Sequence, residues 1–327
     1  MSRPGAGTDH GKDRKYCPLV LPASAPCILH PNKDSETEPE SRGAAAYSDF
    51  ASEDRMATTR RSFLAGALGG AALARAQEPP GVKPEQGVPA RKAKVVRLFK
   101  APDEHPNALE ATRDALWIGG QVTEKAYKVD WKTGKVLHEV QTDSHNTSGI
   151  AVGGGYLWMS ANGRTERRPP RPTDNDFDEI FQADLETGKT IRRYRPPWPG
   201  GSHGIAYVEQ TQTLWVTALG IKALAELDWK DNFRVLRVIP VHHDRAHGID
   251  WDNGAMWVLF SSDYVIHKVD ATTGKVLEVV TLAKGQDPDP HGMCFHDGHL
   301  YYCDAGLVVG GGSNGSPSAG YVCRIDL

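Results

Sequence analysis

Residues 247–277 read HGIDWDNGAMWVLFSSDYVIHKVDATTGKVL. Apolar residues gather around Trp257 and again around Ile266, and turn-forming Gly, Asn, Asp and Ser stand between these runs, which is typical of short antiparallel strands. The stretch ends near Asp270 and Gly274. Glycine there supplies the positive φ of a hairpin bulge, and the aspartate can bond the turn backbone. This segment predicts a small sheet joined by tight turns.

The same pattern recurs five times between residue 92 and the end of the sequence. Successive copies of its Leu-Trp step lie 41, 57, 42 and 44 residues apart. The aromatic residues of this step are Trp117, Trp158, Trp215, Trp257 and Tyr301. A period of about 40 to 45 residues that holds four short strands is the signature of a propeller blade. The sequence predicts an all-β fold, a five-bladed β-propeller over residues 92–327.

The two ends of this region complement each other. The fifth repeat stops after its third strand, residues 321–326, whereas residues 92–100 form an unpaired outer strand. We expect the N-terminal strand to complete the last blade, because that pairing removes two open sheet edges. The repeated tryptophans are expected to fill the spaces between neighbouring blades.

The charge and composition exclude several classes of protein. Lys plus Arg number 38 and Asp plus Glu 41, a net charge of −3, which gives no electrostatic footprint for nucleic acid or anionic lipid. With 39% hydrophobic and 24% charged residues, the chain is typical of a soluble globular protein. We expect a monomer whose partner is a small-molecule or peptide-like substrate.

The residues before the repeats have a different character. Residues 1–55 are polar and without an apolar period, so we interpret them as a disordered or untranslated extension. Residues 56–76 contain Arg60-Arg61, a short apolar run and Ala74-Arg75-Ala76, which indicates a twin-arginine signal peptide. Residues 77–91 are interpreted as a linker. The mature protein is expected in the periplasm or outside the cell, without a membrane span.

The sharpest functional signal is a ring of position-equivalent residues. In a propeller the first strand of each blade lines the central channel, so residues just before the Gly-Ile step of each repeat should face one another. These residues are Asn107, Ser148, His203, His247 and His291. His145 and His105 stand two or three residues earlier in the other two blades. The pattern predicts that every blade brings a histidine toward the same mouth.

Converging neutral imidazoles are typical ligands of Zn, Fe or Cu, and three of them leave open positions for substrate. We therefore predict a divalent metal held by His203, His247 and His291, with His145 or His105. The alternative is that these histidines only pack or hydrogen-bond in the core, since duplicated repeats copy a residue without separate selection.

Two expanded loops are expected on the same face as the ring, in blade two and in blade five, and insertions on one face mark a binding face. The arginines of the blade-two loop either neutralise the acidic residues beside them or, with Arg245, hold a carboxylate-bearing substrate. Asp263 and Tyr264, in the fourth blade, are the candidates for proton transfer.

Other sites are weakly indicated or absent from the sequence. It has no Gly-x-Ser-x-Gly elbow, phosphate loop, Cys-x-x-Cys or His-Glu-x-x-His motif, which disfavours a serine hydrolase or a nucleotide enzyme. Cys294, Cys303 and Cys323 all fall in the last repeat. They are interpreted as small buried residues, although an oxidising destination permits one disulfide.

The His-Gly-Ile steps, the Leu-Trp-Val strands and the Lys-Val-Asp-x-x-Thr-Gly-Lys turns resemble those of the virginiamycin B lyase-like propellers, within the YVTN and quinoprotein-like superfamily, over residues 92–327. The five repeats are similar in number to those of the glutamine cyclotransferases. The resemblance implies a propeller fold and a metal-assisted lyase. In the lyase family a histidine and a glutamate act in the active site, and only the histidine has a counterpart here.

The leading interpretation is thus an exported metal-dependent propeller enzyme, a lyase or hydrolase of a polar small-molecule or peptide-like substrate. A non-catalytic binding propeller for a protein or glycan, and an Fe or Cu redox enzyme with the same ligands, are the alternatives.

Overall fold

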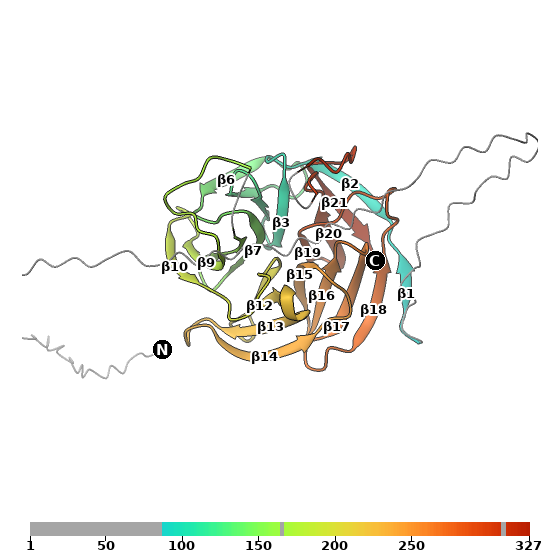
Figure 1. Cartoon of the computed structure of the whole chain (residues 1–327). Coiled ribbons are helices and arrows are strands. Elements are labelled where there is room, and N and C mark those ends of the chain that lie inside the picture. The colour runs from blue at the N-terminus through green and yellow to red at the C-terminus, as the bar shows by residue number, and fades with distance from the viewer. Residues whose placement is uncertain (1–86, 164–166, 309–311) are drawn as a thin grey trace, which may run out of the picture. The chain divides into compact units, whose positions relative to one another are not determined.

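The computed structural model describes residues 87–163, 167–308 and 312–327. Its strands form five antiparallel sheets, the blades, arranged around a common centre (Figure 1). The extension and signal peptide predicted for residues 1–55 and 56–76, and most of the predicted linker, lie outside the described residues.

The first three blades follow one another along the chain, each with its first strand innermost. Blade one contains β3 (Pro106–Ala111), β4 (Leu116–Gly120), β5 (Lys125–Val129) and β6 (Val136–Gln141). Blade two contains β7 (Thr147–Gly153), β8 (Tyr156–Asn162), β9 (Asp178–Asp184) and β10 (Thr190–Tyr194). Blade three contains β11 (Ile205–Val208), β12 (Thr213–Ala218), the 3-10 turn η1 (Leu219–Ile221), β13 (Ala223–Asp228) and β14 (Arg234–Pro240).

The last two blades use strands from both ends of the described chain. Blade four contains β15 (Ala246–Asp252), β16 (Ala255–Phe260), β17 (Val265–Asp270) and β18 (Val276–Thr281), and β1 (Ala90–Lys92) adds to β18 as a parallel fifth strand. Blade five contains β19 (Met293–His296), β20 (His299–Cys303), β21 (Tyr321–Asp326) and β2 (Val95–Lys100).

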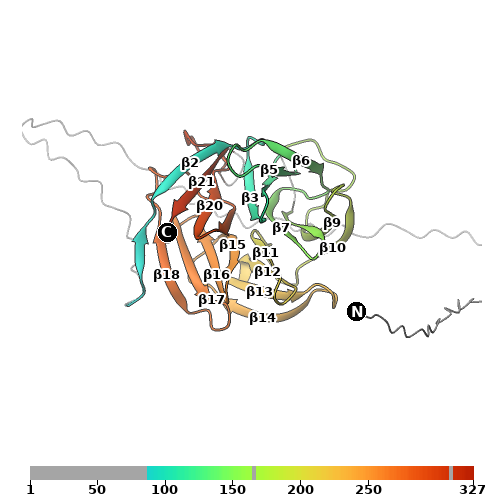
Figure 2. The ribbon, with the colours of Figure 1, turned by 180° about the vertical axis from the view of Figure 1, so that it is seen from behind.

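The N-terminal strand closes the ring, as predicted. β2 pairs antiparallel with β21, and Figure 2 shows the two ends of the ring side by side in blade five. Each inner strand contacts the inner strand of the next blade, and β19 contacts β3, so the circle of inner strands is complete. The predicted five-bladed β-propeller is confirmed.

The repeated aromatic residues pack between blades, as expected. Trp158 joins Val216 and Leu227 of blade three in one buried cluster, and Trp257 joins Tyr302 of blade five in another. Trp117, Trp215 and Tyr301 occupy the corresponding clusters at the other three interfaces. Burying one large aromatic per interface supplies the apolar area that holds neighbouring sheets together.

The Asp-x-x-Thr-Gly-Lys turns are built alike in three blades. Asp130 Oδ1 accepts hydrogen bonds from Thr133 N at 2.9 Å and from Thr133 Oγ1 at 2.7 Å. Gly134 follows with φ of 69°, which glycine adopts without a steric penalty. The turns at Asp184 and Asp270 repeat these contacts.

Cys294, Cys303 and Cys323 are free thiols buried in blade five, and burial raises the pKa of each thiol. The described part of the chain contains no helix long and apolar enough to cross a membrane.

Candidate functional site

A cavity of about 350 Å³ lies at the N-terminal ends of the five inner strands. Every blade contributes one ring residue to its wall: Asn107, Ser148, His203, His247 and His291. The lining also includes Gln121, Asn146, Asn162 and Arg167 from the first two blades, Arg245 from blade four, and Leu307 and Val308 from blade five. The expanded loops of blades two and five therefore reach the same cavity as the ring. We call this the central cavity.

Glycine directly after the ring residue explains why these side chains converge. A Cβ on Gly204 would lie 2.4 Å from the carbonyl oxygen of His247, and one on Gly248 would lie 2.4 Å from Met293 N. Gly149 and Gly292 are equally close to the next blade. Only a residue without Cβ allows the inner strands to approach this closely, so the His-Gly step brings each imidazole near its neighbour.

Three imidazoles from adjacent blades form a continuous cluster. The ring centroids of His203 and His247 are 4.6 Å apart, and those of His247 and His291 are 4.9 Å apart. Burial, reinforced by the positive charge of Arg245, lowers the pKa of His203 to about 3. Burial also lowers the pKa of His247 well below its usual value. Both rings are neutral at pH 7, and the buried Nδ1 of each has no hydrogen-bond partner among the described residues.

The third imidazole has a fixed tautomer. Asn107 Nδ2 donates to the carbonyl oxygen of Thr147 at 2.9 Å, which orients the amide so that its Oδ1 lies 2.9 Å from His291 Nδ1. Because an amide oxygen only accepts, His291 Nδ1 carries the proton. Its Nε2 lies 3.6 Å from Asp289 Oδ2. The ring is thus held between an amide of blade one and a carboxylate of its own blade.

Asp289 is the centre of a polar network beside the cluster. Tyr264 Oη donates to its Oδ1 at 2.7 Å, and Asn314 Nδ2 donates to its Oδ2 at 3.1 Å. Burial would raise the pKa of Asp289, but the neighbouring imidazole of His291 and the hydrogen bonds from Tyr264 and Asn314 lower it to about 2. Burial and the bond to this carboxylate raise the pKa of Tyr264 far above its usual value. Tyr264 is therefore a hydrogen-bond donor that holds Asp289, rather than a group that gives up its proton near neutral pH.

Arg245 lies at the junction of the central cavity with a second cavity of about 640 Å³. The second cavity lies along blades four and five, and Arg245, His291, Leu307 and Val308 line both. We call it the lateral cavity. Of the three catalytic candidates, Tyr264 and Arg245 line the lateral cavity and Asp263 lines neither.

The structure places Asp263, His105 and His145 apart from the cluster. Asp263 Oδ2 lies 3.0 Å from His243 Nδ1, in the loop between β16 and β17. His105 Nδ1 donates to the carbonyl oxygen of Ala305 at 2.8 Å, and His145 Nε2 donates to that of Phe177 at 3.0 Å. None of the three lines the central cavity. The expectation that every blade brings a histidine to one mouth is therefore not met, because two or three residues upstream of the ring position the side chains turn into neighbouring loops.

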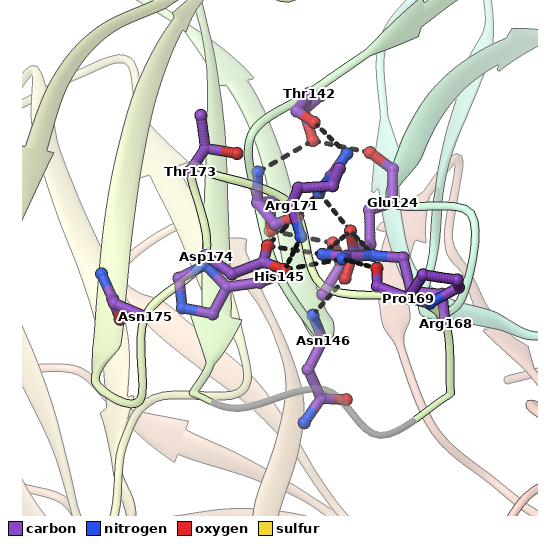
Figure 3. Close-up of polar contacts among 12 residues, drawn as sticks. Glu124, Thr142, His145, Asn146, Arg168, Pro169, Arg171, Thr173, Asp174 and Asn175 are labelled. Carbon is purple, nitrogen blue, oxygen red and sulfur yellow. Dashed lines mark hydrogen bonds and ion pairs between the residues drawn. The ribbon is translucent and has the colours of Figure 1, made fainter.

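The blade-two loop is anchored rather than free (Figure 3). Arg168 binds Asp174 through two hydrogen bonds of 2.7 and 2.6 Å and donates from Nε to Glu124 at 2.6 Å. Arg171 also donates to Glu124, and the Asn146 N–H donates to the other oxygen of that carboxylate at 2.8 Å. These arginines neutralise nearby acids, so they are not available to a substrate.

The metal prediction depends on how the imidazoles meet. Ligands bonded to one ion at about 2.0–2.1 Å place imidazole centroids about 4.5–5.2 Å apart. The observed spacings of 4.6 and 4.9 Å lie within that range. Nevertheless, within the described ranges no group of three His, Cys, Asp or Glu side chains is arranged to hold a metal ion. The centroid spacing alone is compatible with a shared ion, whereas the described side chains do not converge as a metal-binding group.

Several residues at the site were not identified from the sequence. Asp289 and Ser261 come from loop positions that carry no motif, and Glu124 pairs with arginines 44 and 47 residues away. Asp289 stands two positions before a ring residue, as Arg245 does, and that equivalence is the signal that could have found it.

No protein-family model matches the sequence, and no curated protein sequence matches it. Solved structures do match. Glutaminyl cyclase of Myxococcus xanthus superposes with a TM-score of 0.53 at 12% identity, over 73% of this chain and 97% of that one. Virginiamycin B lyase of Staphylococcus aureus gives a TM-score of 0.42 at 15% identity, over 70% of this chain and 68% of that one. The first likeness, together with the five blades, shows that this chain has a β-propeller fold.

Proposed function

We propose that the chain is an exported propeller enzyme, a lyase or hydrolase whose polar substrate binds in the central cavity. His203, His247 and His291 would hold a divalent metal there, Zn, Fe or Cu. When bound, such an ion supplies Lewis-acid chemistry toward a carbonyl or ester oxygen. Export by the twin-arginine route is proposed from Arg60-Arg61, the short apolar run and Ala74-Arg75-Ala76.

The observation that carries the proposal is the state of the imidazoles. A metal ligand must be a neutral ring with a free nitrogen, and burial keeps His203 and His247 neutral while leaving Nδ1 of each without a partner among the described residues. His291 donates its Nδ1 proton to Asn107, which presents Nε2 as the remaining nitrogen. A second hydrogen bond of this kind is what orients histidine ligands in metal sites.

The chain's other residues have roles that do not depend on the ion. Tyr264 and Asn314 hold Asp289, and Asp289 faces His291 Nε2. An ionised carboxylate at this position can stabilise a proton on Nε2, so His291 can accept a proton from a substrate when it is not ligated.

Metal content tests the proposal. Protein purified without an affinity tag should contain close to one equivalent of a transition metal by mass spectrometry. His203→Ala and His247→Ala should each lose most of it. His138→Ala should retain it, because His138 lies on β6 and its Nε2 donates to the carbonyl oxygen of Glu186.

The same four preparations, the wild type and the three variants, should then be assayed against a panel of esters, lactones and amides. Turnover that disappears with the metal would support the proposal. A metal-free wild type, or equal metal in His203→Ala and wild type, would refute metal ligation by the cluster. If the metal is Fe or Cu and cycles between oxidation states with substrate, the redox alternative replaces lysis or hydrolysis.

A second candidate function rests on a different observation. Gln121, Asn146, Ser148 and Asn162 give the central cavity four uncharged polar groups, and the positive charge of Arg245 disfavours a further cation beside His203. Such a wall suits the hydroxyl groups of a glycan, and a non-catalytic binding propeller would need no metal. Retention of glycan binding by His203→Ala, with no turnover of any substrate in wild type, would favour this candidate.

A further inference from the structure

The charged groups that line the lateral cavity differ in whether they have hydrogen-bond partners. Lys284 Nζ donates to the carbonyl oxygen of Ser262 at 3.2 Å, and Asp287 Oδ2 accepts from Ala283 N at 2.7 Å. Asp289 accepts from Tyr264 and Asn314. By contrast, the guanidinium of Arg245 makes no hydrogen bond or ion pair within the described parts of the chain. Among the described residues it is the charged group of this wall without a direct hydrogen bond or ion pair, and only the nearby carboxylate of Asp289 favours its charge.

Arg245 is also held in an unfavourable backbone conformation. Its φ is 53°, in the left-handed region, and the equivalent residues of blades two and three share it, with Asn146 at 51° and Gly201 at 76°. Asparagine and glycine adopt this conformation readily, whereas a long side chain does not. An arginine at the position therefore acts against the stability of the loop. Such strain at a cavity wall is typical of a residue kept for binding.

A second unpartnered group lies beside the arginine. Ser261 N–H donates to the carbonyl oxygen of Arg245 at 3.4 Å, so the two residues are neighbours across the start of blade four. Ser261 lines the lateral cavity and is only 4% exposed, and its Oγ has no hydrogen-bond partner among the described residues. A buried hydroxyl without a partner carries a free-energy penalty that a ligand can remove.

We propose that Arg245 and Ser261 bind a carboxylate group of the ligand at the junction of the two cavities. A guanidinium and a hydroxyl together supply N–H and O–H groups from which a carboxylate accepts hydrogen bonds. Asp287 and Asp289 in the same wall act against a dianion such as phosphate. The proposal rests on the proposed function only in taking this ligand to be the substrate of the histidine cluster: its remaining part would extend over His291 into the central cavity.

Thermal shift and calorimetric titration test the proposal with N-acetylglycine, its neutral amide N-acetylglycinamide, and inorganic phosphate. N-acetylglycine should raise the unfolding midpoint of the wild type, and the amide should not. Arg245→Asn should weaken the binding of N-acetylglycine at least tenfold, and Ser261→Ala should weaken this binding severalfold. Because asparagine relieves the left-handed backbone, Arg245→Asn without ligand should unfold at a temperature equal to or above that of the wild type.

Three results would overturn the proposal: no wild-type binding of N-acetylglycine at 20 mM or about that concentration, equal binding by Arg245→Asn, or tighter binding of phosphate than of N-acetylglycine. A lower midpoint for ligand-free Arg245→Asn would assign the arginine a structural role instead. Failure of the proposed function is separable from these results. His203→Ala should bind N-acetylglycine as the wild type does whatever its metal content, and Arg245→Asn should keep any metal that the wild type holds.

Discussion

The two sides of the central cavity differ in how completely their polar groups are satisfied. On the side of blades one and two, Gln121 Nε2 donates to Asn146 Oδ1 at 2.8 Å, and Asn107 Nδ2 donates to the carbonyl oxygen of Thr147. On the side of blades three and four, His203 Nδ1, His247 Nδ1 and Ser261 Oγ have no partner within the described ranges. Polar side chains of the cavity are therefore hydrogen-bonded to one another on one side, whereas on the other side buried polar atoms lack hydrogen-bond partners among the described residues.

This difference separates residues whose polar groups are satisfied within the fold from residues that we propose bind a ligand. A buried polar group without a partner lowers stability, so the blade-three and blade-four side is a place where the chain gives up stability. A satisfied network returns stability but leaves fewer free donors and acceptors for a ligand. Substitutions on the side of blades one and two should accordingly lower stability. Substitutions on the side of blades three and four should instead change the binding of ligands or protons.

The largest effect is expected on the satisfied side, at Glu124. Its carboxylate is completely buried and binds Arg168, Arg171 and the Asn146 N–H. Glu124→Ala would leave two guanidiniums without their shared partner, so we expect a loss of about 3–5 kcal/mol in the free energy of unfolding. Urea denaturation measures this loss.

Glu139→Ala is the matched control. Glu139 pairs with Lys125 at 2.9 Å on the surface of blade one, with 48% of its side chain exposed, so we expect less than about 1 kcal/mol. Equal losses in the two variants would contradict the view that the blade-two loop is fixed by the buried cluster.

The pH dependence of stability should show the effect of the buried neutral histidines on the side of blades three and four. The pKa of His203 falls from 6.5 to about 3 on folding, so between these values the unfolded chain binds more protons than the native one. Stability from this group is present above pH 6.5 and is lost as the pH falls. Between pH 6.5 and 4.5 we expect the wild type to lose about 2 kcal/mol more than His203→Gln. His247 acts in the same direction.

Other buried groups require that this measurement be a difference between variants. Burial raises the pKa of Asp250 to about 7 and that of Glu110 well above its usual value, and both therefore add stability as the pH falls. These carboxyls are common to wild type and variant, so their contribution cancels. His138→Gln is the control, and its pH profile should follow the wild type. A His203→Gln profile parallel to the wild type would show that His203 is not held neutral.

The fold could be predicted from the sequence because its determinants are periodic. The tryptophan of each repeat and the Asp-Thr-Gly turn are set by residues close together in the chain, and closure of the ring by residues 92–100 follows from counting strands. The position of the ring at His203, His247 and His291 followed from the same symmetry, since equivalent residues of a closed propeller must face one another. The metal itself stays a prediction.

What symmetry does not encode could not be predicted. His145 and His105 are offset from the ring position, and the irregular loop backbone at those offsets turns each toward a local carbonyl oxygen. Asp263 meets His243 because of the path of a single loop. The ion pair of Glu124 with Arg168 depends on the path of the long blade-two loop, and the repeat pattern does not specify that path.

A smaller stability effect than that at Glu124 is expected at Asn107, whose amide links blade two to blade five. Its amide bonds both Thr147 and His291, so Asn107→Leu removes two buried hydrogen bonds while keeping the side-chain volume. We expect a loss of about 1 kcal/mol in unfolding free energy. The ¹⁵N chemical shifts of the His291 ring should show a change of tautomer. The wild-type ring carries its proton on Nδ1, and the variant loses the acceptor that fixes the proton there. Ser148→Ala, which leaves the bond to His291 in place, should keep the wild-type tautomer. A His291 that stays in the Nδ1–H form in Asn107→Leu would mean that its tautomer does not depend on the amide of Asn107.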